Sequence, residues 1–89
     1  MNPTNLNQLK NYLQIGMSLT LIDTSMKDHK YLNQTRKIAI KQTNAIKFVG
    51  GSWLYFGKAK DYTFKDNQFT NTWDKGTAFS GFLTYEFIS

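Results

Sequence analysis

The chain has 89 residues, with eleven basic and six acidic side chains, a net charge of +5 and no cysteine. A chain of this length is typical of one domain, so we expect residues 1–89 to fold as a single unit. The lack of cysteine excludes disulfides, thiolate metal sites and thiol catalysis. Small secreted domains usually depend on such cross-links, and the opening residues MNPTNLNQLK contain no apolar signal segment. We therefore expect a cytoplasmic protein, with no membrane partner because its apolar runs are far shorter than a membrane span.

At the N-terminus we expect a helix over about residues 5–15. Leu6, Leu9 and Leu13 recur at helical spacing, Thr4 or Asn5 can cap the first turn, and Gly16 is a suitable stop signal. A helix this short is marginal in isolation. Its leucine face should therefore dock on the rest of the protein and cover an open end of a sheet.

The remaining residues, about 17–89, carry the alternation and turn signals of β structure. Strands are expected at 17–22, 36–48, 53–56, 62–65, 68–72 and 82–88, with turns at 49–52 and 66–67. A long loop over residues 23–33 separates the first two strands and carries the lone His29, which we interpret as a solvated histidine. A second irregular loop is expected over residues 71–81.

The most regular element is the run RKIAIKQTNAIKF, residues 36–48. Successive side chains of an extended chain point to opposite faces, so one parity should face the core and the other should face solvent. The expected inner set is Ile38, Ile40, Gln42, Asn44, Ile46 and Phe48, and the expected outer set is Lys37, Ala39, Lys41, Thr43, Ala45 and Lys47. Thirteen extended residues would reach roughly 40 Å. We therefore expect a bulge or turn near residues 42–44 that preserves the parity.

Together these elements predict an α+β fold with an N-terminal helix plus a small, strongly bent antiparallel sheet, in the form of an SH3-like or OB-like barrel. Closure into a barrel would remove exposed strand edges. The alternative is a helix packed on an open curved sheet. A strand left at an open edge, such as residues 17–22 or 82–88, could then form an oligomer by pairing with a second copy.

Residues 43–64, TNAIKFVGGSWLYFGKAKDYTF, combine a basic extended run, a short turn, a Ser-Trp strand, a Lys-Ala connector and an aromatic strand. This segment resembles a pattern in small proteins of phages and other mobile elements of Gram-positive bacteria, a group without an established activity. The matching residues are Thr43, Asn44, Ala45, Ile46, Phe48, Ser52, Trp53, Leu54, Lys58 and Ala59. The resemblance implies a bacterial mobile-element setting and nothing catalytic.

No pattern in the chain predicts an enzyme, a metal site or a cofactor. General acid–base catalysis needs a histidine or paired carboxylates in a pocket, and the six acidic residues share no motif with His29. Gly50 and Gly51 precede Ser-Trp, and not the Gly-Lys-Ser of a phosphate-binding loop. We therefore expect a binding module that is not an enzyme.

The positive charge is concentrated in the middle of the chain. Eight of the eleven basic residues, but only one of the six acidic residues, lie between Lys27 and Lys60. A local field of this kind favours an anionic partner, although a merely solvated basic face has the same composition. Binders of single-stranded nucleic acid combine such a field with exposed aromatic rings.

The sequence therefore predicts a surface for single-stranded DNA or RNA. Its expected residues are Lys37, Lys41, Lys47, Trp53, Tyr55, Lys58 and Lys60. Trp53 and Tyr55 should share the outer face, with Leu54 and Phe56 pointing inward. The alternative function is a protein-interaction module or inhibitor, encoded by a mobile element, that binds an acidic surface of a host or phage protein.

Overall fold

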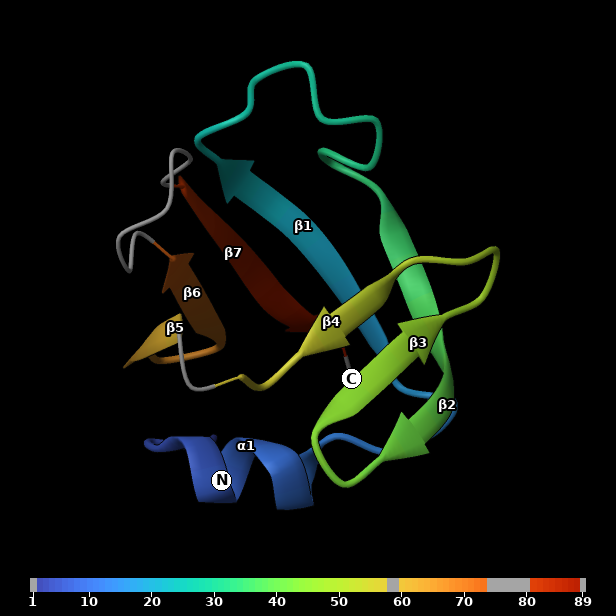
Figure 1. Ribbon diagram of the computed structural model, residues 1–89, viewed down its shortest axis with the longest axis vertical. Coiled ribbons are helices and arrows are strands. Elements are labelled where there is room, and N and C mark those ends of the chain that lie inside the picture. Colours follow the sequence, from blue (N-terminus) through green and yellow to red (C-terminus); the bar gives the residue numbers. More distant parts are fainter. Residues whose placement is uncertain (1, 58–59, 74–80, 89) are drawn as a thin grey trace.

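Antiparallel strands make up most of the computed structural model, which describes residues 2–57, 60–73 and 81–88. Within these residues one helix precedes seven strands (Figure 1). They are α1 (Leu6–Tyr12), β1 (Ser18–Thr24), β2 (Thr35–Gln42), β3 (Ala45–Phe48), β4 (Trp53–Tyr55), β5 (Lys60–Lys65), β6 (Gln68–Trp73) and β7 (Gly81–Ile88). The strands form one sheet in the order β4-β3-β2-β1-β7-β6-β5. The predicted class, a helix with an antiparallel sheet, is confirmed, but the sheet is larger than expected.

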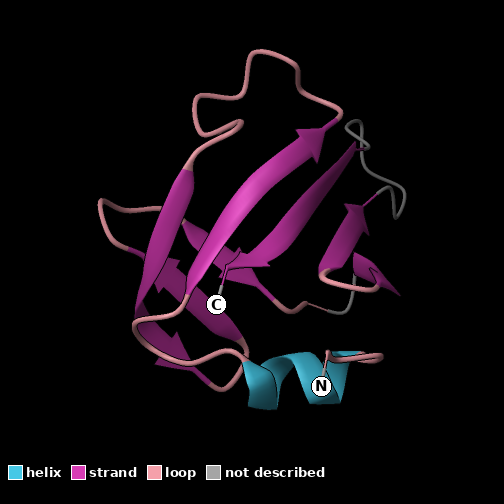
Figure 2. Cartoon of the chain, turned by 180° about the vertical axis from the view of Figure 1, so that it is seen from behind, coloured by secondary structure: helices cyan, strands magenta, loops and turns pink. Residues whose placement is uncertain are grey.

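The helix α1 is shorter than the predicted range of 5–15. The side chain of Asn5 caps it by accepting a hydrogen bond from the N–H of Gln8 at 2.9 Å. Leu13 already has extended backbone angles and ends the helix. Leu9 and Leu13 are fully buried, and the Tyr12 ring contacts the Phe87 ring of β7 at 5.0 Å. The leucine face therefore docks at one end of the sheet, as predicted, and the long loop after β1 lies at the other end (Figure 2).

The sheet bends until its two halves face each other. β3 and β4 lie in front of β1 and β7 in Figure 1 and behind them in Figure 2. The rings of Phe48 in β3 and Tyr85 in β7 stack at 5.8 Å across the interior. Buried side chains from both halves and from the helix form one core: Leu9, Leu13, Leu19, Leu21, Ile38, Ile46, Phe48, Leu54, Phe56, Phe69, Tyr85 and Phe87. Each large apolar side chain in this set contributes about 1.5–3 kcal/mol when fully buried.

The sheet does not close into a barrel. β4 and β5 are its edges, and in the described part of the chain no backbone ladder joins them. A side chain bridges the edges instead, because the Tyr62 hydroxyl donates to the Tyr55 carbonyl oxygen at 3.0 Å. The prediction that the strands at 17–22 and 82–88 have open edges is wrong, since β1 lies between β2 and β7, and β7 lies between β1 and β6.

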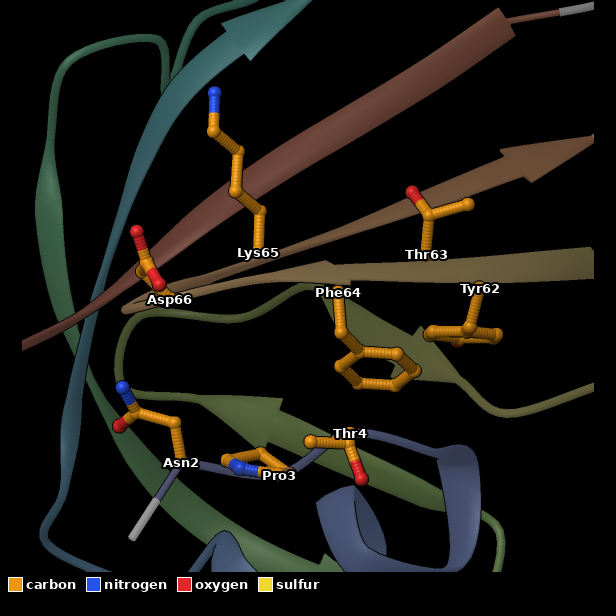
Figure 3. A pocket seen from close by; sticks show the side chains of 8 residues that line it. All are labelled: Asn2, Pro3, Thr4, Tyr62, Thr63, Phe64, Lys65 and Asp66. Atoms are coloured by element: carbon orange, nitrogen blue, oxygen red, sulfur yellow. The ribbon is translucent and has the colours of Figure 1, made fainter.

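The inner side of edge strand β5 faces the N-terminal segment. Tyr62 and Phe64 point toward Pro3 and Thr4, whereas Lys65 points to the other side of the strand (Figure 3). These residues line a hollow of about 490 Å³ between β5 and the segment that leads into α1. The N-terminal segment therefore covers the aromatic side of this edge, and Lys65 remains exposed.

A register shift in β2 overturns the predicted inward direction of half of the expected inner set. Ile38 pairs with Phe48, but the next pair is Ile40 with Lys47, so the chain gains one residue between them. Such a bulge moves every later side chain of the strand to the opposite face. Ile38, Ile46 and Phe48 are buried, as predicted, whereas Ile40 is 41% exposed. Gln42 and Asn44 are also exposed, so the expected inner set is correct only at its two ends.

The predicted break in this run is present, and it restores the inward direction of β3. β2 ends at Gln42, and β3 begins at Ala45 after a two-residue turn. The next turn, over residues 49–52, was also predicted, and Gly50 and Gly51 there have φ values of +91° and +108°. Glycine adopts these angles without strain. This pair of short hairpins brings β4 back along β3 and places Trp53 opposite Lys47.

Candidate nucleic-acid interface

A lysine and two aromatic rings form a stack on the outer face of β3 and β4. Lys47 and Trp53 are paired across the two strands, and paired residues share a face. The Lys47 ammonium lies 5.8 Å from the Trp53 ring centroid, and the Trp53 and Tyr55 rings stack at 6.0 Å with an interplanar angle of 23°. Leu54 and Phe56 are buried. The prediction that Trp53 and Tyr55 share the outer face is therefore confirmed.

Exposed residues of β2 extend this outer face. Ile40 pairs with Lys47, so it belongs to the same row as Trp53. The side chain of Lys37 is exposed, and the carbonyl oxygen of Lys37 accepts a hydrogen bond from Val49, which is 58% exposed. We call the set Lys37, Ile40, Lys47, Val49, Trp53 and Tyr55 the outer platform. It combines two cations with two stacked rings and two exposed aliphatic side chains.

Lys41 does not belong to the outer platform. It pairs with Ile46, which is fully buried, so the Lys41 side chain leaves the sheet on the inner side near its end. The bulge in β2 is the cause, because it reverses the face of every residue after Ala39. Lys58 lies outside the described residues, and so does the side chain of Lys60, whose backbone begins β5.

The single arginine of the chain clamps the long loop to the turn between β3 and β4. The Arg36 guanidinium lies 3.8 Å from the Tyr31 ring centroid and 4.9 Å from that of Phe48. It donates hydrogen bonds to the Ser52 hydroxyl and to the carbonyl oxygens of Val49 and Gly51. A planar guanidinium can stack and donate at the same time. In the sequence Arg36 is one of eleven basic residues, and no local pattern predicts its contacts with Tyr31 and with the turn over residues 49–52.

A hollow of about 410 Å³ opens at the end of the sheet that lies opposite α1. Its walls come from the loop between β1 and β2, the start of β4, and β7. The lining residues are Met26, Asp28, His29, Lys30, Tyr31, Ser52, Trp53, Leu83 and Tyr85. We call this cavity the loop hollow. Trp53 belongs both to the loop hollow and to the outer platform, so the two surfaces are continuous at its ring.

His29 differs from its sequence interpretation as a solvated histidine. His29 is half-buried, and its Nδ1 atom accepts a hydrogen bond from the backbone N–H of Tyr31 at 3.1 Å. It is therefore part of a wall and not a freely solvated side chain.

Tyr85 forms a buried part of the same hollow. Burial raises the pKa of Tyr85 to about 12, although the charge of Arg36 acts in the opposite direction. The Tyr85 hydroxyl thus stays neutral at physiological pH. No local sequence pattern predicts that β7 contributes to this site. The curvature of the sheet brings β7 here.

The described residues contain no group of three or more His, Asp or Glu side chains placed to hold a metal ion. Within the same ranges, no helix has the length and apolar character needed to span a membrane. Comparisons of the chain with protein-family models, with curated proteins and with solved structures found no match.

Proposed function

We propose that this protein is a small basic binding module, without enzymatic activity, that binds single-stranded DNA or RNA along the outer platform. The observation that carries the proposal is the stack of Lys47, Trp53 and Tyr55. Bases stack on exposed aromatic rings, and cations beside those rings attract the phosphates. Tyr55 is 54% exposed, so its ring is accessible to a base.

Single strands fit this surface better than a duplex does. Sequence-specific contacts to guanine in a duplex favour arginine, which binds O6 and N7 with two hydrogen bonds. The single arginine of this chain is engaged with the Ser52 hydroxyl and with carbonyl oxygens of the 49–52 turn. Stacking on rings, by contrast, tolerates any base sequence. The proposed site therefore binds with little sequence preference.

The test is fluorescence anisotropy with a labelled 12-nucleotide oligothymidine, titrated at several salt concentrations. Trp53→Ala should weaken binding by about 1–3 kcal/mol, the contribution of one stacked base. Lys37→Gln combined with Lys47→Gln should lower the slope of log affinity against log salt by about 1.4, because each phosphate contact to a single strand contributes about 0.7.

The matched control combines Lys27→Gln with Lys65→Gln. These two exposed lysines lie outside the outer platform, so the control removes the same charge. The affinity and salt slope of this control should stay closer to those of the parent than those of the Lys37→Gln, Lys47→Gln double variant do. If the platform double variant and the control lose the same affinity, only net charge matters. If the parent shows no binding in low salt, the outer platform is a solvated surface and the proposal is wrong.

The exposed aliphatic side chains favour a second candidate function. Ile40 is 41% exposed and Val49 58% exposed on the outer platform, which also carries two aromatic rings, and such mixed apolar patches mark protein-binding surfaces. An inhibitor encoded by a mobile element would use this surface against an acidic face of a host or phage protein in the cytoplasm. Its binding would depend less steeply on salt than counterion release from a nucleic acid does.

Binding of a single-stranded nucleic acid also suits the type of fold that we infer for this protein. We infer a barrel-like architecture of SH3-like or OB-like type, supported by the approach of β4 and β5 through Tyr62 and Tyr55. Barrels of this size present curved, partly open faces to their ligands.

A further inference from the structure

We propose that the loop hollow is a nucleotide subsite, which receives the base and phosphate of one unstacked nucleotide. The proposal rests on the proposed function, since that nucleotide would belong to the strand bound on the outer platform. The hollow is distinct from the platform in its residues, apart from Trp53, and in the segments that build it.

The size and lining of the loop hollow suit a nucleotide. Small-molecule sites measure about 300–1,000 Å³ and combine apolar or aromatic walls with a few polar groups. Here Tyr31, Trp53 and Tyr85 come from three different segments. Unstacked bases in single strands are bound on aromatic side chains and through hydrogen bonds to their edges. Tyr85 is buried and stacks with Phe48 and Phe69, so the partly exposed rings of Tyr31 and Trp53 offer the surface for the base itself.

The polar groups of the hollow complement the other parts of a nucleotide. The Lys30 ammonium lines the hollow, 5.0 Å from the Tyr31 ring centroid, and supplies a positive charge for a phosphate. Since Nδ1 of His29 accepts from the backbone, the neutral ring carries its proton on Nε2 and can donate to a base edge. The carboxylate of Asp28 can accept from an exocyclic amine or a ribose hydroxyl.

The walls of the hollow are held in place before any ligand binds. The Arg36 guanidinium lies over the Tyr31 ring at 3.8 Å and donates a hydrogen bond to the Ser52 hydroxyl in the turn between β3 and β4. The Tyr85 ring stacks with that of Phe48 at 5.8 Å and with that of Phe69 at 5.4 Å. A site with supported side chains loses less conformational freedom on binding. Trp53 then links the hollow to the platform, so a strand can continue from one to the other.

The test uses adenosine 5′-monophosphate as the probe, in an NMR titration of the full chain. The probe should shift the resonances of His29, Tyr31 and Leu83 in a saturable way. Ribose 5-phosphate, which lacks the base, should leave them unchanged at the same concentration. Lys30→Gln should weaken binding of adenosine 5′-monophosphate at least threefold and leave binding of adenosine unchanged. Lys27→Gln is the matched control from the same loop, because Lys27 pairs with Asp23 and does not line the hollow.

Three outcomes would overturn the subsite: no saturable shift in the hollow, equal shifts from ribose 5-phosphate, or shifts from an oligoglutamate peptide in place of the nucleotide. The last would assign the hollow to an acidic peptide. The oligothymidine titration separates this result from the parent proposal. If the strand binds and the mononucleotide does not, the subsite is wrong and the outer platform stands. If the mononucleotide binds and the strand does not, the platform is wrong and the hollow stands as a mononucleotide site.

Discussion

The hydroxyl of Tyr62 and the carbonyl oxygen of Tyr55, 3.0 Å apart, join the two edge strands of an open sheet. The Tyr62 ring also contacts Phe56 at 6.1 Å, beside the same bond. This contact links β5 to β4 without a backbone ladder in the described residues.

Replacing Tyr62 with phenylalanine should therefore loosen this junction. The variant keeps the ring and loses one hydrogen bond, which contributes about 0.5–1.5 kcal/mol to the free energy of unfolding. For a domain of this size the expected drop in melting temperature is about 4–8 °C per kcal/mol. Tyr55→Phe is the control, because the bond uses the backbone carbonyl of Tyr55. Equal melting temperatures for the two variants would show that the junction is not stabilising.

Stability should fall in the alkaline range because two tyrosines are buried. Burial raises the pKa of Tyr62 and of Tyr85 from 10.0 to about 12. Between pH 10 and pH 12 the unfolded chain loses these protons while the folded chain retains them. The free energy of unfolding should therefore be unaffected by these groups below pH 10 and decrease as the pH rises toward 12.

Urea unfolding at pH 9 to 12 measures this decrease. The Tyr62→Phe variant should show a shallower decline than the parent. The lysines titrate in the same range in both proteins, so the difference between the two curves isolates Tyr62. Parallel curves would contradict the assignment of a raised pKa to this residue.

The bulge in β2 predicts that alanine substitution destabilises the protein much more at Ile38 than at Ile40. Ile38 is 1% exposed, so Ile38→Ala should cost about 2–5 kcal/mol. Ile40 is 41% exposed, so Ile40→Ala should cost less than about 1 kcal/mol. Thermal unfolding of the two variants decides the point. Similar losses would mean that β2 runs without the register shift and that both isoleucines face the core.

Arg36 should resist replacement by lysine. A lysine keeps the charge, but it can neither stack on Tyr31 as a plane nor donate in a fork to the turn over residues 49–52. We expect Arg36→Lys to lose about 1–3 kcal/mol and to speed amide hydrogen exchange in the loop between β1 and β2. Lys37→Ala, at the exposed neighbouring position, should leave both quantities unchanged. A parental exchange pattern in Arg36→Lys would contradict the clamp.

Local signals predicted the elements of this fold well. The spacing of Leu6, Leu9 and Leu13 and the cap at Asn5 placed the helix, and the Gly50-Gly51 pair placed a turn. The helix still ends earlier than predicted, since Leu13 has an extended backbone and a fully buried side chain. Alternation in residues 53–56 also identified which side of β4 carries Trp53 and Tyr55.

The chain by itself thus determined its helix, its turns and most of its strands, because hydrophobic spacing and turn residues act over a few neighbours. The tertiary structure alone decided the rest. A single added residue between Ile38 and Ile40 leaves no mark in composition, yet it turns Ile40 outward and Lys41 inward. The open edges and the loop hollow depend on which strands meet when the sheet bends. The loop hollow brings together residues as far apart in the sequence as Tyr31 and Tyr85, and no local pattern encodes this proximity.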